Sequence, residues 1–394
     1  MTVCFPTKTL LAASTAFSVL CFSPAYAFEA EDVAGRLAGT LANSGYSISW
    51  ASSSVNGDAI VLEGVKAGLA GAGDEVEVGA VVLNGVAEAD DGTYTVELVS
   101  LPDYSLEEDG IKVSMSGATL SGLVLPPEGA EKSMRSIVPY TGIALALINV
   151  TGPDGEIFNM ANLNAVMNIP EDGGQADFTT TIEGFTINSA SFPEAEARAV
   201  FAALGYSVVE GSMDSHGTWN TDDGQMAINK MALSVKDAGT LDFNLDIGGY
   251  TLEFLESMQT MQKKMMEEGE DENTGLAMLG LMQQITFHSA KVRFDDQSLT
   301  NKVLQFVADQ QGMKPSDIAN QAKAILPFAM AQLNNPDFTA QVTAAVSAYL
   351  DNPQSIEVSA DPGEPLPIAM LIAGGMSAPE QLPNQLGVKV TANE

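Results

Sequence analysis

The chain has 394 residues and a formal net charge of −34, because 51 Asp and Glu residues stand against 17 Lys and Arg residues. A chain this acidic repels nucleic acid and anionic membrane surfaces, so we expect neither as a partner. Hydrophobic residues make up 45% of the sequence, which is enough to fill a sizeable core and argues against disorder. We interpret the acidity as a solubility feature, with loose cation binding as the weaker alternative.

The first 27 residues have the pattern of a cleavable secretory signal peptide. Lys8 precedes an apolar segment over residues 10–22, and Ala25-Tyr26-Ala27 matches the small-residue cleavage site. The apolar segment is shorter than the roughly 20 residues that a membrane-spanning helix needs, so a membrane anchor is the less favoured alternative. The sequence therefore predicts a periplasmic protein that begins at Phe28 and has no transmembrane helix after cleavage.

Both cysteines, Cys4 and Cys21, lie in the predicted signal peptide. The mature chain would then have no disulfide, no thiolate metal ligand and no cysteine nucleophile. An exported chain without disulfides must be held together by burial of its core.

A short helix is predicted over residues 30–43, where apolar residues recur every four positions. Beyond it the sequence is strand-like and repeats a pattern of Leu or Ile, any residue, Gly and an apolar residue. The copies are Leu62–Val65, Leu83–Val86, Leu120–Leu123 and Ile182–Phe185, with a looser one at 247–250. Glycine inside a strand marks a bend or a bulge, so the pattern predicts a long curved sheet with bends at Gly64, Gly85, Gly122 and Gly184.

The strand-like region extends to about residue 250 and is divided by turn signals such as Asn56-Gly57. We expect a β-rich domain over 28–250. The order helix, Gly-Tyr, strands recurs near residue 193, which indicates either two similar halves, 28–190 and 191–250, or the ordinary way in which a helix precedes a sheet.

A helix-rich α+β portion is predicted over 251–394. Two methionine-rich helices within 251–285 flank an acidic break at 267–273, and a strand follows over 286–294. Ser298 or Asp296, Pro315 and Asn335-Pro336 mark the starts of three more helices. Strands are predicted at 355–360 and 388–392. The predicted fold class is α+β, with a long curved antiparallel sheet packed against amphipathic helices.

Motifs that carry chemistry are scarce. The two histidines, His216 and His288, lack the spacing of a zinc site, and the sequence has no nucleophile-elbow or phosphate-loop pattern. The Asp-Gly pairs do not fit a calcium-binding loop and are typical of hairpin turns. We therefore expect no catalytic residue, no metal and no cofactor. An enzyme remains the least favoured alternative, and it requires a cleft in which His216 or His288 meets paired carboxylates.

Methionines at helical spacing form the one candidate binding surface. They are Met258, Met261, Met265, Met278 and Met282. Methionine fills irregular apolar gaps and suits surfaces that accept varied partners, so these residues could line an apolar ligand site. Ordinary core packing is favoured over this interpretation, and copper(I) binding is the third alternative.

The segment Gly45-Tyr46-Ser47-Ile48-Ser49-Trp50, followed by Gly57 to Val65, resembles the start of AsmA-like envelope proteins and of related periplasmic families. Asp295 to Leu299, leading into Leu304 to Ala308, is also similar to such proteins. The resemblance implies long curved sheets and supplies no catalytic residues. We expect a non-enzymatic periplasmic protein that binds lipid or another apolar ligand in envelope maintenance. The alternative is an interaction or structural module whose partner is another envelope protein.

Overall fold

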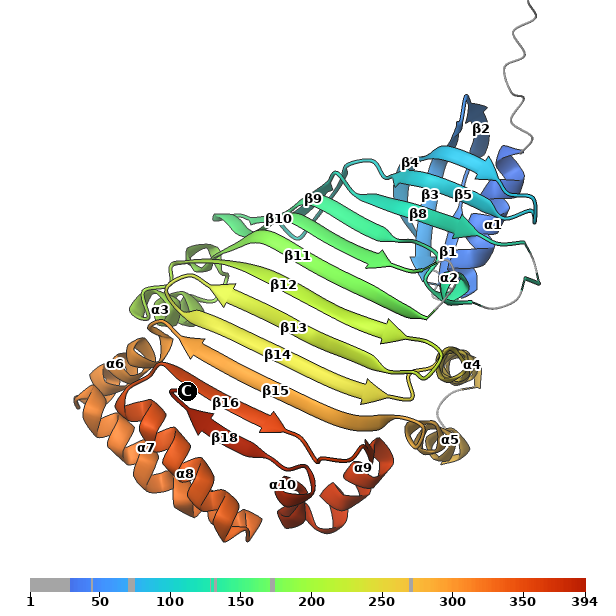
Figure 1. Ribbon diagram of the computed structural model, residues 1–394. Helices are drawn as coiled ribbons and strands as arrows, with labels where there is room; N and C mark the ends of the chain where they lie inside the picture. Colours follow the sequence, from blue (N-terminus) through green and yellow to red (C-terminus); the bar gives the residue numbers. More distant parts are fainter. Residues whose placement is uncertain are drawn as a thin grey trace, which may run out of the picture.

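The structure is a computed structural model that describes residues 29–43, 45–69, 75–127, 129–130, 133–170, 174–268 and 272–394. The predicted signal peptide, with both cysteines, lies outside the described residues, as does the centre of the acidic break. The described strands form one 18-stranded antiparallel sheet, which is open and curved and is accompanied by helices (Figure 1). The α+β fold class is therefore confirmed.

The strands begin and end close to the predicted turns. In chain order they are β1 (Tyr46–Ser49), β2 (Ser52–Asn56), β3 (Ala59–Leu69), β4 (Glu75–Glu88), β5 (Tyr94–Ser100), β6 (Tyr104–Glu108), β7 (Ile111–Ser116), β8 (Thr119–Leu125), β9 (Gly142–Gly152), β10 (Gly155–Asn168), β11 (Gln175–Asn188), β12 (Val208–Asn220), β13 (Met226–Val235), β14 (Gly239–Gly248), β15 (Thr286–Asp296), β16 (Ser355–Ala360), β17 (Leu366–Pro367) and β18 (Lys389–Ala392). The helices are α1 (Ala30–Asn43), α2 (Met134–Ile137), α3 (Ala195–Ala203), α4 (Leu252–Glu268), α5 (Glu272–Met282), α6 (Leu299–Gln311), α7 (Pro315–Met330), α8 (Pro336–Asp351), α9 (Ile368–Ser377) and α10 (Leu382–Gln385).

The chain builds the sheet as a meander. β1 and β2 pair with successive parts of β3, and the sheet then continues through β4, β5, β8 and β9. The β6–β7 hairpin pairs with β9 beyond the end of β8. From β9 to β16 each strand pairs with the next, and β18 follows β16. Because β14 pairs with β15, the sheet continues without interruption past residue 250.

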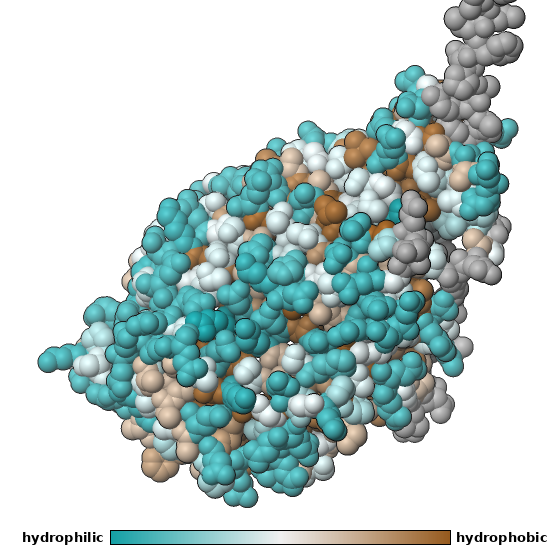
Figure 2. Space-filling view, in the orientation of Figure 1, coloured by the Kyte–Doolittle hydropathy of each residue, from teal (hydrophilic) through white to brown (hydrophobic). Residues whose placement is uncertain are grey.

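The two faces of the sheet differ in chemistry, because directly opposed residues of paired strands share a face. One row from β11 to β16 is apolar throughout: Ile182, Met213, Leu233, Leu241, Phe294 and Ile356. The adjacent row lies on the other face and is mostly polar: Thr181, Asp214, Ala232, Asp242, Arg293 and Glu357. We call these the apolar face and the polar face. Figure 2 shows mainly hydrophilic residues over β11–β15, so it presents the polar face.

The largest hydrophobic cluster of the described residues lies at the N-terminal end of the apolar face. Val33 and Leu37 of α1 pack there against residues of β3, β4, β5 and β8 that include Ile60, Leu83 and Leu125. A smaller cluster joins Met134 of α2 and Leu252 and Leu255 of α4 to Ala176 and Trp219 of the sheet. Helices thus cover the apolar face over β3, β4, β5 and β8, and again near Ala176 and Trp219.

The repeated glycine pattern breaks the alternation of side chains along a strand. Gly64, Gly85 and Gly122 have φ values of 62°, 64° and 61°, a left-handed conformation that glycine adopts readily. In a regular strand, residues three positions apart point to opposite faces. Here both apolar members of a copy turn inward, as Leu62 and Val65 do. Gly184 differs, because its φ lies outside the left-handed range and the positive φ falls on Asn162 of β10 instead.

The remaining helices lie mainly beyond the strand ends (Figure 1). α8 also protects the last strand: the Val390 N–H donates to Gln341 Oε1 at 3.2 Å, and Asn393 Nδ2 donates to the Ala348 carbonyl at 3.0 Å. The first bond uses a backbone N–H of β18 that would otherwise be free to pair with another chain, and the second holds the residue after β18 against α8. Among the described residues, none of the helices has the length and apolar character needed to cross a membrane.

Candidate functional site

The strongest candidate site is the part of the apolar face that the helices leave open. Leu233, Leu241, Val292 and Val358 lie on β13–β16 and are 38%, 43%, 42% and 43% exposed. Leu233 is directly opposite Leu241, and Val292 is opposite Val358. Phe294 of β15 is opposite Leu241 of β14, and it connects the two pairs. We call these four residues with Phe294 the open patch.

Exposure of a contiguous apolar surface requires an explanation. One face of an antiparallel sheet is normally buried against other elements, and a continuous exposed apolar patch marks a place where something binds. Neither hydrophobic cluster of the described residues includes a member of the open patch. The alternation of apolar and polar residues in β13–β15 could have identified these positions, but sequence reasoning selected the methionines instead.

The five methionines lie on two helices that follow β14. Met258, Met261 and Met265 belong to α4, and Met278 and Met282 belong to α5; all five side chains are half-buried. α4 and α5 contact each other and lie beyond the ends of β14 and β15 (Figure 1). The structure brings these helices together at one border of the sheet. Whether the methionines take part in ligand binding stays a prediction.

His288 lies on the polar face in a chain of hydrogen-bonding groups. Its Nδ1 is 3.2 Å from Asp246 Oδ1, and its Nε2 is 3.1 Å from Thr286 Oγ1. Asp361 and Glu364 line the same shallow pocket of about 270 Å³. His288 therefore meets carboxylates in a pocket, as the enzyme alternative requires. His216 is an exposed residue of β12 and does not line this pocket.

The order hydroxyl, imidazole, carboxylate is that of an activated nucleophile. The surroundings oppose this chemistry, since Asp361 and Glu364 would repel the negative charge that develops on an oxyanion. No group of three or more metal-ligating side chains occurs within the described part of the chain. We interpret the Thr286–His288–Asp246 contacts as a hydrogen-bonded network of a solvated sheet face.

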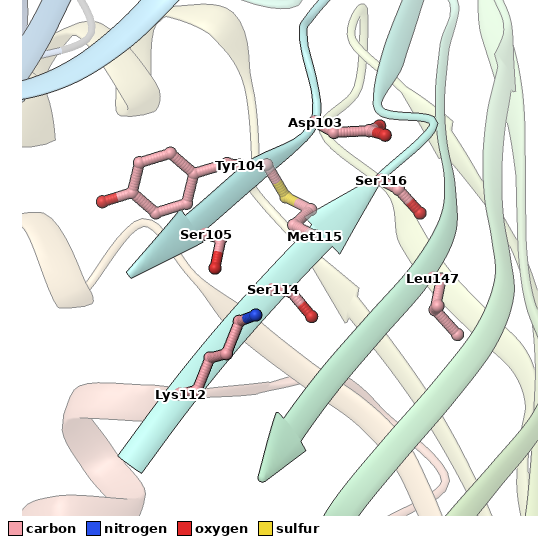
Figure 3. A pocket seen from close by; sticks show the side chains of 8 residues that line it. All are labelled: Asp103, Tyr104, Ser105, Lys112, Ser114, Met115, Ser116 and Leu147. Atoms are coloured by element: carbon pink, nitrogen blue, oxygen red, sulfur yellow. The ribbon is translucent and has the colours of Figure 1, made fainter. Parts of the chain in front are cut away.

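A second pocket of about 200 Å³ lies beside the β6–β7 hairpin. Figure 3 shows its lining, in which Lys112, Ser114 and Ser116 follow one another along β7 and Asp103 stands at the far end. The small volume and the polar side chains do not suit a long apolar ligand.

Ion pairs cover the polar face from β12 to β16. Lys230 Nζ is 2.9 Å from Asp214 Oδ2, and Arg293 Nη2 is 2.8 Å from Asp295 Oδ1. The hydrogen bonds to Asp295 raise the pKa of Arg293 above its ordinary value. Because these charges already have partners, the polar face is an ordinary solvated surface.

Comparison with known proteins identifies one similar region. A family model described only as "Uncharacterized protein" matches residues 232–393, a span that begins in β13 and ends after β18. No curated protein matches the chain. The matched span contains the whole open patch and the helices α4–α10.

Proposed function

We propose that this protein is an exported, non-enzymatic protein that holds a lipid, or another ligand with a long apolar chain, on its apolar face. The observation that carries the proposal is the open patch on β13–β16. An apolar chain laid on it would remove half-exposed Leu and Val side chains from water. That burial stabilises the complex by about 25 cal/mol per Å² of apolar surface.

The dimensions of the apolar face suit one acyl chain. Strands in a sheet lie about 4.8 Å apart, so the row from Ile182 on β11 to Ile356 on β16 crosses roughly 24 Å. One leaflet of a bilayer core is about 15 Å thick. A single acyl chain therefore fits along the row without leaving the apolar face.

Two features of the sequence support a role in the cell envelope. Residues 1–27 have the pattern of a cleavable export signal, and the N-terminal strands resemble AsmA-like envelope proteins. Envelope maintenance requires lipid to cross the aqueous periplasm, and a lipid-binding protein there would carry it. The proposal includes no catalytic residue and no cofactor.

Native mass spectrometry of the protein purified from its own cells tests this function. We expect bound species with the masses of lipids, and a loss of about tenfold in occupancy for Val292→Glu, which introduces a charge into the open patch. Val166→Glu is the matched control, because Val166 is 48% exposed on the polar face. A wild-type protein that repeatedly carries no lipid would overturn the proposal.

A second experiment at position 292 separates the proposal from the alternative of a protein-binding module. A photo-cross-linking amino acid at position 292 should label lipid if the proposal holds. Cross-linking in cells to one dominant protein would favour the interaction module instead. Strand addition at β18 is not expected, since α8 already occupies that edge.

A further inference from the structure

The helix α9 belongs to a segment of the chain that has no charged residues. Residues 365–379 contain no Asp, Glu, Lys or Arg, although charged residues make up 17% of the chain. Glu364 and Glu380 bound the segment on either side. An exposed helix in an acidic protein normally carries charges on its outer face, so this composition points to a non-aqueous contact.

Three apolar side chains of α9 are exposed. Met370, Ile372 and Met376 are 62%, 42% and 86% exposed. On its inner face, Gly374 and Gly375 pack closely against Leu382 of α10. A helix that is apolar all round is normally buried. α9 has only 10 residues, about 15 Å at 1.5 Å per residue, so it is too short to cross a bilayer.

The position of α9 joins it to the apolar face. β17 leads directly into α9, and Leu366 of β17 is opposite Phe287 of β15. Phe287 is in turn opposite Ile247 of β14, on the apolar face. α5 contacts α9, and Leu279 of α5 is 46% exposed. The exposed surface of α9 and α5 therefore lies at the border of the apolar face that carries Phe287, roughly 17 Å along β15 from Val292 of the open patch.

We propose that α9, together with Leu279, docks onto the surface of an uncharged lipid bilayer and delivers the ligand to or from the apolar face. This inference rests on the proposed function. The net charge of −34 decides which surface α9 can bind, because it repels both an anionic bilayer and a second copy of the chain. A zwitterionic lipid surface carries no such repulsion and accepts apolar side chains at its interface.

Flotation of the full chain with phosphatidylcholine vesicles tests the inference. We expect the wild-type protein to float with the vesicles, and the double variant Ile372→Glu with Met376→Glu to bind about a hundredfold more weakly. The control is Ile325→Glu with Phe328→Glu on α7, which adds the same charges at side chains that are 62% and 80% exposed. The control should bind like the wild type, and circular dichroism should show all three proteins folded.

The outcomes separate this inference from the proposed function. Lipid found by native mass spectrometry, with no flotation of the wild type, overturns only the docking role of α9. Flotation that depends on α9, with no lipid carried, overturns the proposed function and the delivery of ligand, and supports only the docking of α9 onto the bilayer. Equal loss in both double variants means unspecific adhesion and overturns the docking role. A wild-type dimer that the α9 variant converts to a monomer, without flotation, assigns the surface to a second copy.

Discussion

The two ends of the apolar face are built from similar strands but have different surroundings. At the N-terminal end Leu83 is fully buried under the cluster that α1 completes. At the other end Leu241 occupies the same face and is 43% exposed. Apolar side chains point to this face in both places, through the glycine pattern in β3, β4 and β8 and through alternation in β13–β15. The difference therefore lies in the helices and not in the strands.

The placement of the helices explains the difference. α1 precedes the sheet and lays Val33 and Leu37 over it, so the face there becomes a core. α6, α7 and α8 connect β15 to β16 and lie beyond the strand ends and along β18 (Figure 1). The first end is therefore a buried core, and the second leaves Leu241 and its neighbours half-exposed.

The largest expected effect comes from shortening a buried side chain at the covered end of the apolar face. Leu83→Ala should lower the free energy of unfolding by about 3–4 kcal/mol, because it removes a buried side chain and leaves a cavity. Leu241→Ala is the matched change on the open end and should cost less than about 1 kcal/mol, since its side chain is already half in water. Urea denaturation of both variants measures the contrast. Equal losses would show that the open patch is covered in solution.

Glycine geometry gives a second and smaller contrast. Gly85→Ala should cost about 2 kcal/mol, because φ at this position is 64° and an added Cβ would lie 2.6 Å from Glu97 Cγ. Gly184→Ala should change stability by no more than about 0.5 kcal/mol, since its φ is not left-handed and no atom lies within 4 Å of the added carbon. Thermal unfolding of the two variants checks this. A similar loss at both positions would mean that the four copies of the pattern are structurally equivalent.

Local features of the fold were predictable from the sequence. Asn335 accepts the Phe338 N–H at 3.1 Å at the start of α8, and Gly312 ends α6 with a φ of 66°, both as expected. Asp296 rather than Ser298 supplies the side-chain cap of α6, since its Oδ2 accepts the Thr300 N–H at 2.9 Å. Caps and turns depend on a few neighbouring residues, so composition and spacing are enough to locate them.

Long-range features were not predictable. The composition changes near residue 250, yet β14 and β15 pair across the two helical segments between them. Alternation in β13–β15 shows that one face is apolar, but it cannot show whether a helix covers that face. For the same reason the sequence pointed to the methionines of α4 and α5 and missed Leu241 and Val292. Exposure is a property of the packed elements and not of one strand.

The smallest expected effect tests whether the two ends respond alike to alkaline pH. Burial and a hydrogen-bonded aspartate raise the pKa of Tyr94 at the covered end, and of Tyr349 at the other, to about 12. The Tyr94 hydroxyl donates to Asp32 at 2.7 Å and the Tyr349 hydroxyl to Asp296 at 2.9 Å. A pKa above the ordinary value of about 10 means that this stability is fully present below pH 10. It is then lost as pH rises through 12.

Replacing either tyrosine with phenylalanine should cost about 1 kcal/mol at pH 8, the net value of one hydrogen bond. It should also make the fall in stability between pH 8 and pH 11 shallower, because one group that must lose its proton is gone. Urea denaturation at the two pH values measures both effects for Tyr94→Phe and Tyr349→Phe. Matching changes would show that the two ends unfold as one cooperative unit, although helices cover only one of them. A shallower fall for Tyr349→Phe alone would show that the open end unfolds first.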